Sequence, residues 1–253
     1  MAFQLGADTA ALKARIAVND RRAEHNLEDW IAAEAQIRPG LAVADLGCGT
    51  GKQIFAFAPK LLPDGSILGL DISRAAVDEV NSRARDLGLA HVSAVLGGLD
   101  GAPEVLAKAA FDLILSTYAI YYATDVVDLI RKLAAALREG GQLFVSGPGS
   151  GTNLEMTDLL AALAPRHAPA PIDDFISEVQ IRTASEAYAS TSVARLENAV
   201  RFGSAEEVLV WWKNHASFRP ELEEGVASAL QRHFESAPAF EMTKNVLGVH
   251  FYR

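Results

Sequence analysis

The sequence predicts a doubly wound α/β fold with a mostly parallel sheet. Between residues 41 and 147, short apolar segments of strand length alternate with segments in which apolar residues recur every three or four positions. Strands that alternate with helices imply a parallel sheet with helices on both faces and right-handed crossovers. Hydrophobic residues make up 50% of the 253-residue chain, which is enough for the large core that this fold requires.

The first elements follow from a change of rhythm near residue 40. Apolar residues within 8–36 are spaced by three and four, which predicts a helical segment that ends before the proline–glycine pair at 39–40. The segment Leu41–Leu46 is a short apolar run bounded by glycine, as in a buried parallel strand. Helical spacing returns over Ile54–Leu61 and stops before the turn residues 63–65.

The rest of the core continues the alternation. Ser73 is expected to cap a helix that runs to Leu87 and closes at Gly88, since serine suits an N-cap and glycine suits a helix end. A second helix is expected over Asp125–Leu137, ended by the turn Glu139-Gly140-Gly141. The four further strands of the core are expected at Ser66–Leu70 (closed by Asp71), His91–Leu96, Phe111–Ser116 and Gln142–Ser146.

Beyond Pro148 the pattern loosens. The elements expected there are helices over Asn153–Leu163 and Glu221–Phe234, strands over Ser192–Phe202 and Val246–Tyr252, and a helix through Trp211 and Trp212 opened by the capping-box pair Ser204 and Glu207. One domain over 1–253 is the simplest organisation. Its parts are an N-terminal helical segment (1–40), a core (41–147), a cap insertion (148–190) and C-terminal strands and helices (191–253).

Composition limits the classes of function. The formal net charge is −9, with 32 acidic against 23 basic residues, which opposes non-specific binding to the nucleic-acid backbone. The single cysteine, Cys48, cannot form an internal disulfide. The first residues lack a secretory pattern, and no apolar run reaches the ~18 residues of a membrane span. We therefore expect a cytoplasmic protein with no nucleic-acid or membrane partner, in an oligomeric state that the sequence leaves open.

The glycine-rich stretch VADLGCGTGKQ at 43–53 can be compared with two known phosphate-binding patterns. A P-loop needs its first glycine where Leu46 stands and a hydroxyl where Gln53 stands, so that pattern fails twice. A dinucleotide fingerprint needs a third glycine where Lys52 stands. Asp45, two residues before the first glycine, would repel a pyrophosphate but suits a ligand that carries an ammonium group.

The combination Asp45-x-Gly47-x-Gly49-x-Gly51 resembles the first motif of the class I S-adenosylmethionine-dependent methyltransferases. The resemblance extends through ordered landmarks to residue 147. It implies a Rossmann-like methyltransferase fold with a seven-stranded sheet, S-adenosyl-L-methionine as cofactor and S-adenosyl-L-homocysteine as product. A glycine turn that has lost its cofactor is the structural alternative.

Further site residues are implied by the same resemblance. Asp71 is expected to accept hydrogen bonds from the ribose hydroxyls, with Ile72 packing on the adenine. The loop after the third strand has Gly98 where the family usually has Asp or Asn, so backbone groups of Gly98 and Leu99, or Asp100, are expected to serve instead. Phe111–Ser116 resembles the fourth-strand motif and Leu137–Gly141 the turn before the fifth strand, and Ser116 and Thr117 are assigned to the cofactor site.

The substrate is expected beyond the carboxyl ends of the strands. Tyr118, Tyr121 and Tyr122 follow the fourth strand there and could bind an acceptor, although Tyr121 and Tyr122 could equally pack the next helix. Tyr118 and His167 are the candidate catalytic residues, His167 because it lies in the cap insertion; an ordinary exposed histidine is the alternative. No spacing of ligand residues suggests a metal.

These observations predict methyl transfer to an O, N or C atom of a small organic metabolite. The segment after the fourth strand lacks the paired prolines of DNA amino-methyltransferases, which argues against a nucleic-acid base. One alternative is a carboxylate O-methyltransferase of the trans-aconitate type, for which Arg182, Arg195 and Arg201 could bind the acid. Others are a non-catalytic S-adenosylmethionine-binding scaffold and a related fold that uses the bound sulfonium without donating its methyl group.

Overall fold

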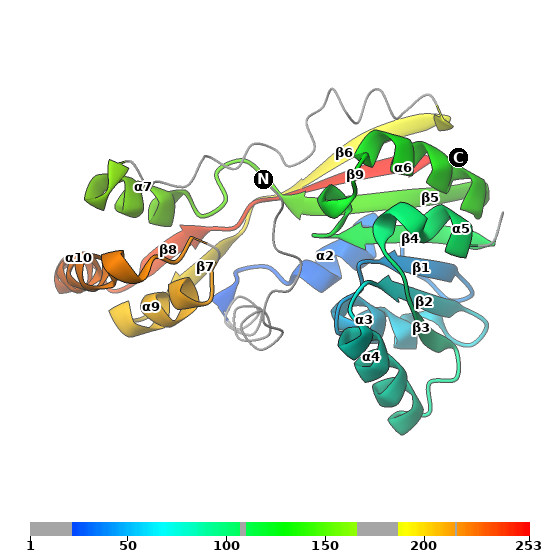
Figure 1. Cartoon of the computed structure of the whole chain (residues 1–253), viewed down its shortest axis with the longest axis horizontal. Coiled ribbons are helices and arrows are strands. Elements are labelled where there is room, and N and C mark those ends of the chain that lie inside the picture. The colour runs from blue at the N-terminus through cyan, green and yellow to red at the C-terminus, as the bar shows by residue number, and fades with distance from the viewer. Residues whose placement is uncertain (1–21, 107–109, 166–186, 216) are drawn as a thin grey trace. The chain divides into compact units, whose positions relative to one another are not determined.

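The computed structural model describes residues 22–106, 110–165, 187–215 and 217–253 (Figure 1). These residues form two compact units. The larger unit comprises the described residues within Glu28–Pro148, Asp174–Arg195 and Leu247–Arg253. The smaller unit comprises those within Met1–Leu27, Gly149–Asp173 and Leu196–Val246. The organisation of the whole chain as a single domain stays a prediction.

A mostly parallel, seven-stranded sheet forms the centre of the larger unit, in the order β3-β2-β1-β4-β5-β9-β6. Parallel pairing joins β1 to β2 and β4, β2 to β3, and β4 to β5. The strands are β1 (Ala42–Leu46), β2 (Ser66–Asp71), β3 (Val92–Leu96), β4 (Phe111–Thr117), β5 (Leu137–Pro148), β6 (Ser190–Leu196) and β9 (Val246–Tyr252). The predicted fold class is therefore confirmed.

Helices cover both faces of this sheet (Figure 1). One face packs against α5 (Ala102–Val105) and α6 (Val126–Leu133), and its buried cluster includes Leu46, Ile114 and Val145. The other face is covered by α2 (Leu27–Glu34), α3 (Lys52–Leu61) and α4 (Arg74–Asp86). On that face the Gln142 side chain donates to the carbonyl of Ala35 at the end of α2, and Gly69 lies directly under Ile54 of α3.

Several local signals in the sequence act as predicted. Ser73 caps α4, because its hydroxyl accepts from the amide of Ala76, and Gly88 follows the helix with a φ of 67°. Asp125 also caps α6, by accepting from the amide of Asp128, although no cap is predicted there from the sequence. These short-range hydrogen bonds define helix boundaries without any contribution from the tertiary fold.

The smaller unit has its own core. Its two-stranded antiparallel sheet consists of β7 (Ala199–Phe202) and β8 (Phe240–Thr243). Packed with it are α7 (Leu154–Leu163), α9 (Ala205–Lys213) and α10 (Glu223–Ser236), the last preceded by a 3-10 turn at Pro220–Leu222. Trp211 and Trp212 are fully buried there, and Ser204 caps α9 as the sequence predicts, by accepting from the amide of Glu207.

Two predictions about the smaller unit and its borders are wrong. The strand expected over Ser192–Phe202 is two strands in different sheets, because Asn198 interrupts it. The Asn198 side chain accepts from the amide of His25 and donates to the carbonyl of the same residue. The helix expected over 8–36 is also not continuous, since Ala23 bridges to β7 and α2 starts only at Leu27; residues 8–21 lie outside the described residues. Strand β8 has no counterpart in the prediction.

A third correction concerns the start of β5. The turn predicted at Glu139-Gly140-Gly141 is a bulge inside the strand, because Phe111 pairs with Leu137 while Leu113 pairs with Gln142. The helix expected over Asp125–Leu137 accordingly ends at Leu133 and continues only as a 3-10 turn, Ala134–Ala136. The glycine pair is a local turn signal, but the strand continues through it: the amide of Gly140 donates to the carbonyl of Arg253, and the amide of Arg253 donates to the carbonyl of Gly141.

Candidate functional site

The strand order creates a topological switch point between β1 and β4. The chain passes from β1 outward to β2 and β3, and then returns to place β4 on the other side of β1. Loops that leave the carboxyl ends of these two strands therefore diverge, and ligands of open α/β sheets bind in the crevice that results. The glycine turn follows β1 at this place, and Tyr118 follows β4.

The glycine turn needs glycine for two different reasons. Gly47, Gly49 and Gly51 have φ values of 75°, 52° and 81°, in the left-handed region that side chains disfavour. At Gly47 a Cβ atom would also lie 2.3 Å from the Cβ of Ala119, which leaves no room for a side chain. At Gly49 nothing lies within 4 Å of the same position, so its backbone faces open space. The turn thus presents bare backbone to the crevice.

Asp71, at the end of β2, ties the glycine turn to the next helix. One carboxylate oxygen accepts from the amide of Gly49 at 2.8 Å, and the other accepts from the amide of Ser73 at 2.9 Å. Each oxygen keeps a lone pair for a further donor, such as a ligand hydroxyl. Ile72, the next residue, is 60% exposed, which is unusual for an aliphatic side chain and leaves an apolar surface beside the carboxylate.

Asp45 is buried beneath the turn without a complete set of partners. Its side chain is 2% exposed, and its Oδ2 atom has no hydrogen-bond partner. Burial, together with the charge of Asp71, raises the pKa of Asp45 to about 7. A carboxylate in this state would be stabilised by a cationic ligand, so the arrangement fits the ammonium group that the sequence predicts here.

The end of β4 contains one satisfied and one unsatisfied hydroxyl. Ser116 is fully buried, and its hydroxyl donates to the carbonyl of Leu46 at 3.0 Å, which joins β4 to β1 just before the glycine turn. The hydroxyl oxygen of Thr117 is buried with no hydrogen-bond partner. A cofactor contact of Ser116 and Thr117 stays a prediction, and the visible contact of Ser116 is with the backbone.

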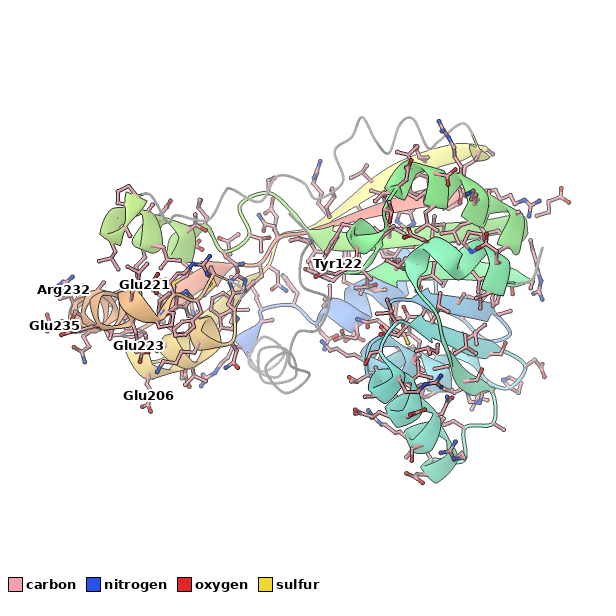
Figure 2. All side chains as sticks on the ribbon, in the orientation of Figure 1. Tyr122, Glu206, Glu221, Glu223, Arg232 and Glu235 are labelled. Atoms are coloured by element: carbon pink, nitrogen blue, oxygen red, sulfur yellow. The ribbon has the colours of Figure 1, made fainter. Side chains whose placement is uncertain are left out.

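Tyr118 has a strained backbone at the start of the next loop. Its φ is 55°, a value that bulky side chains rarely adopt, and its amide donates to the carbonyl of Ser146 at 2.7 Å. The side chain is 36% exposed, while burial around its phenol raises the pKa. Tyr121 and Tyr122 follow with ring centroids 4.7 Å apart. Tyr122 is 44% exposed at the end of the sheet where β4 stops (Figure 2).

The loop after β3 places the remaining predicted residues. The side chain of Asp100 is engaged, because its two oxygens accept from the amide and the hydroxyl of Thr124 at 2.9 and 2.7 Å, and these bonds lower its pKa. A Cβ atom on Gly98 would lie 3.9 Å from Ile72, so Gly98 borders the same exposed apolar surface. Leu99 packs partly against the core.

Two residues of the site were missed by sequence reasoning. Ser146, in β5, is fully buried and its hydroxyl has no partner; a serine at the end of a predicted strand was the available signal. Glu28 of α2 is 9% exposed and pairs with Lys52 at 2.8 Å, at the start of the helix that follows the glycine turn. Nothing in the local sequence links Glu28 to that turn.

Other predicted residues lie elsewhere. His167 and Arg182 are outside the described residues. Arg201 pairs with Glu241 in the smaller unit. Over the described ranges, no group of three His, Cys, Asp or Glu side chains could hold a metal ion, and the absence of a metal stays a prediction. None of the described helices has both the length and the apolar character that crossing a membrane requires.

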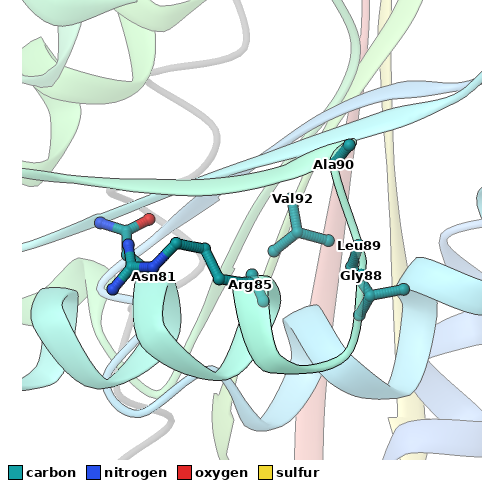
Figure 3. Close-up of a pocket in the computed structure, with 7 residues that line it drawn as sticks. Asn81, Arg85, Gly88, Leu89, Ala90 and Val92 are labelled. Atoms are coloured by element: carbon teal, nitrogen blue, oxygen red, sulfur yellow. The ribbon is translucent and has the colours of Figure 1, made fainter.

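A cavity of about 440 Å³ lies at the end of the sheet opposite the glycine turn, where the chain passes from α4 to β3. Gly88 and Ala90 of that turn and Arg85 of α4 line it (Figure 3). Because β3 starts there, the cavity is at the amino edge of the sheet, away from the glycine turn. It plays no part in the candidate site.

Comparison with known proteins shows that the chain is similar to one protein family and to several methyltransferases. Residues 37–193 match the family model for a methyltransferase domain. A nocamycin O-methyltransferase from Saccharothrix syringae is 30% identical over 146 residues, which cover 58% of this chain and 50% of that protein. Aklanonic acid methyltransferase DauC from a Streptomyces species is 28% identical over 109 residues, which cover 43% of this chain and 49% of that protein. The chain thus spans about half the length of these relatives.

Solved structures support the fold. The YcgJ protein of Bacillus subtilis superposes with a TM-score of 0.61 at 16% identity, covering 89% of this chain and 97% of that one. A geranyl diphosphate C-methyltransferase from Streptomyces coelicolor, solved with Mg²⁺, geranyl diphosphate and S-adenosyl-L-homocysteine, superposes with a TM-score of 0.56 at 16% identity. That match covers 89% of this chain and 78% of the other. At these identities the likeness shows the arrangement of the sheet and helices alone.

Proposed function

We propose, from the premise that this chain belongs to the methyltransferase-domain family, that it transfers a methyl group from S-adenosyl-L-methionine to a small organic molecule. The observation that supports this most directly is the unpartnered oxygen of Asp45, buried under the glycine turn. A buried carboxylate with a free oxygen is costly on its own and becomes favourable when a cation completes it.

The residues around Asp45 suit the rest of the cofactor. Asp71 has lone pairs left for the two ribose hydroxyls, and the exposed Ile72 offers a surface for the adenine. Backbone groups of Gly98 and Leu99 would form hydrogen bonds with the adenine, since the Asp100 side chain is already bonded to Thr124. When bound, the sulfonium supplies a methyl group that its own charge already activates.

The protein's own part is to hold the acceptor in line and to exclude water. Positioning of this kind supplies much of the rate of a direct displacement. Tyr118, Tyr121 and Tyr122 follow β4 at the crevice and are proposed to orient the acceptor. A general base is required only for an acceptor atom that is protonated at the working pH, and His167 is the proposed base in that case.

Several features support a small-molecule acceptor. The two relatives are named for nocamycin and aklanonic acid, both small molecules, and the net charge of −9 opposes binding to nucleic acid. On the smaller unit, Figure 2 shows four glutamates, Glu206, Glu221, Glu223 and Glu235, and one arginine, Arg232. A cytoplasmic location belongs to the same proposal. Of the arginines considered for a carboxylate acceptor, Arg201 is engaged with Glu241.

Isothermal titration calorimetry with S-adenosyl-L-homocysteine tests the cofactor half of the proposal. We expect binding to the wild-type protein, weakened in Asp45→Asn and unaffected in Asp112→Asn, which alters an aspartate at the amino edge of the same sheet. Absence of binding at millimolar ligand would refute the proposal.

Methyl transfer itself is tested with isotopically labelled S-adenosyl-L-methionine and a broad panel of small acceptors. Transfer of label to an acceptor supports the enzyme. Binding of the cofactor with no transfer across the panel would favour a scaffold, or a protein that uses the sulfonium only for its charge.

A further inference from the structure

Unpartnered polar atoms gather at one place in the larger unit. Among the described residues, five buried side-chain nitrogen or oxygen atoms have no hydrogen-bond partner. Two are the indole nitrogens of Trp211 and Trp212, in the smaller unit. The other three are oxygens of Asp45, Thr117 and Ser146, in β1, β4 and β5, that is, in the two strands at the switch point and the strand next to them. Asp45 is explained by the proposed cofactor, but the two hydroxyls are not.

The register of the sheet puts the three oxygens on one face. Asp45 of β1 pairs with Leu115 of β4, and Leu115 pairs with Phe144 of β5. Two residues farther along, Thr117 pairs with Ser146. Since side chains alternate between faces, residues two apart share a face, so Asp45, Thr117 and Ser146 all project to the side that α2 and α3 cover.

Thr117 and Ser146 form a pair that is distinct from Asp45. They are direct neighbours on adjacent strands, which lie about 4.8 Å apart. Both are two positions closer to the carboxyl edge than the row that contains Asp45, and therefore closer to the crevice. If one ligand group binds Asp45, these two hydroxyls stay available to a different group that lies nearer the crevice.

Ser116 shows what a purely structural hydroxyl looks like at this place. It lies between Leu115 and Thr117 in β4, points to the opposite face and donates to the carbonyl of Leu46. By contrast, Thr117 and Ser146 are buried hydroxyls that lose their hydration without replacement, which destabilises the ligand-free fold. Such groups are typical of sites where stability is lost in favour of ligand binding.

We propose that the hydroxyls of Thr117 and Ser146 form a two-donor site for an acidic oxygen of the methyl acceptor, that is, an enol, phenol or carboxyl oxygen bound as the anion. This inference rests on the proposed function and specifies its substrate class. Hydroxyls can also accept hydrogen bonds, but the bound cofactor would place positive charge beside Asp45. That charge attracts an anionic oxygen and repels an ammonium group. This proposal assigns Thr117 to the acceptor, whereas the prediction from the sequence assigns it to the cofactor.

Binding of simple probes to the protein saturated with S-adenosyl-L-homocysteine tests the site. The probes are acetylacetone, phenol and benzoate, with toluene as the oxygen-free control and benzylamine as the cationic one. We expect at least one oxygen probe to bind more tightly than both controls. Thr117→Val and Ser146→Ala should each weaken that probe about 10-fold, through loss of one hydrogen bond to a charged group, without changing toluene binding.

A stability measurement separates a ligand site from a structural role. Without ligand, Thr117→Val and Ser146→Ala should melt at the same temperature as the wild type or higher, because each removes an unsatisfied hydroxyl. The matched variant Ser116→Ala should melt lower, because it removes a satisfied one. Equal losses in all three variants would show that Thr117 and Ser146 are structural and would overturn the inference.

The failure of this inference is distinguishable from failure of the proposed function. If S-adenosyl-L-homocysteine does not bind the wild type, the proposed function and the inference fall together. If it binds, and binds both hydroxyl variants within about 2-fold of the wild type, the cofactor site stands independently. Oxygen probes that then bind no better than toluene or benzylamine would refute the two-donor site alone.

Discussion

The two edges of the seven-stranded sheet differ in how completely their polar groups are satisfied. At the amino edge, Asp112 accepts from the amide of Ala42 and from Arg138, both at 2.7 Å. At the carboxyl edge, Asp45 and its neighbours Thr117 and Ser146 have buried oxygens with no partner.

The backbone shows the same contrast. Residues with positive φ at the amino edge are Gln36 and glycines such as Gly40 and Gly88, and a Cβ atom at either of these two glycines would meet nothing within 4 Å. At the carboxyl edge a tyrosine, Tyr118, has positive φ, and Gly47 is held against Ala119. Left-handed backbone at a non-glycine residue thus occurs at both edges, but the unpaired buried oxygens and the tight approach of Gly47 to Ala119 belong to the carboxyl edge, where a ligand would complete them.

The largest expected effect comes from a glycine at each edge. Gly47→Ala combines a left-handed backbone with a 2.3 Å approach to Ala119, so we expect a loss of about 2–5 kcal/mol in unfolding free energy and loss of cofactor binding. Gly140→Ala, at φ 74° with open space around it, should cost only about 1–2 kcal/mol. Urea denaturation measures the unfolding free energy of both variants. Equal losses would show that the two edges tolerate a side chain equally well.

The next effect is a dependence of stability on pH that arises from Asp45. The pKa of Asp45 is about 7 in the folded protein, above the ordinary value of 3.8. The protonated carboxyl therefore stabilises the fold fully below about pH 4, and this stabilisation is lost as the pH rises through 7. The loss is at most about 4 kcal/mol. Asp45→Asn should flatten this part of the stability profile and raise the melting temperature at pH 8.

Cofactor binding should show the opposite dependence on pH. An ammonium group prefers the ionised carboxylate, so the affinity of wild-type protein for S-adenosyl-L-homocysteine should increase as the pH rises through 7. Calorimetry at several pH values measures this. An affinity that is flat between pH 6 and 8 would contradict the contact between Asp45 and the ammonium group.

A smaller effect separates two aspartates that both accept backbone amides. Asp71→Ala should weaken cofactor binding by about 1–3 kcal/mol, because it removes a charged acceptor and loosens the amide of Gly49. Asp112→Ala should instead lower the free energy of unfolding by about 1–3 kcal/mol, because it leaves the amide of Ala42 without its acceptor, and should leave the cofactor dissociation constant unchanged. A binding defect in Asp112→Ala as large as that in Asp71→Ala would show that the two edges are not functionally distinct.

The smallest expected effect concerns Tyr118. Tyr118→Phe keeps the ring and removes the phenol, so the acceptor's kinetic constants should change while cofactor affinity stays within about 2-fold of the wild type. The measurement pairs steady-state kinetics on an acceptor found in the panel with calorimetry on S-adenosyl-L-homocysteine. A defect confined to the cofactor would contradict the proposed place of Tyr118.

Much of the fold could be predicted because its signals are local. The caps at Ser73 and Ser204, the glycine turn and the apolar strands each lie within a few residues of the structure that they specify. Asn198 shows the limit of such signals. Its hydrogen bonds to His25 join residues 173 positions apart and split an apparently continuous strand. Strand β8 was missed because its short sequence, FEMT, forms a strand only by pairing with β7.

The candidate site divides in the same way. The motif that contains Asp45 and the acid at Asp71 could be recognised from spacing. The ion pair between Glu28 and Lys52 could not, because it depends on how α2 packs over the sheet. Nor could the pairing of Thr117 with Ser146, which is set by the register between β4 and β5. Recognition from the sequence therefore extends to the cofactor but not to the acceptor.

The position of β9 has a consequence for biosynthesis. Strand β9 lies between β5 and β6 in the sheet, yet Val246–Tyr252 follows every helix of the smaller unit in the chain. On the ribosome, β5 therefore emerges roughly a hundred residues before the strand that covers its edge, and β6 has no partner until then. A nascent chain must therefore keep the edge of β5 from pairing with other chains until β9, which is synthesised after both β5 and β6, pairs with these two strands.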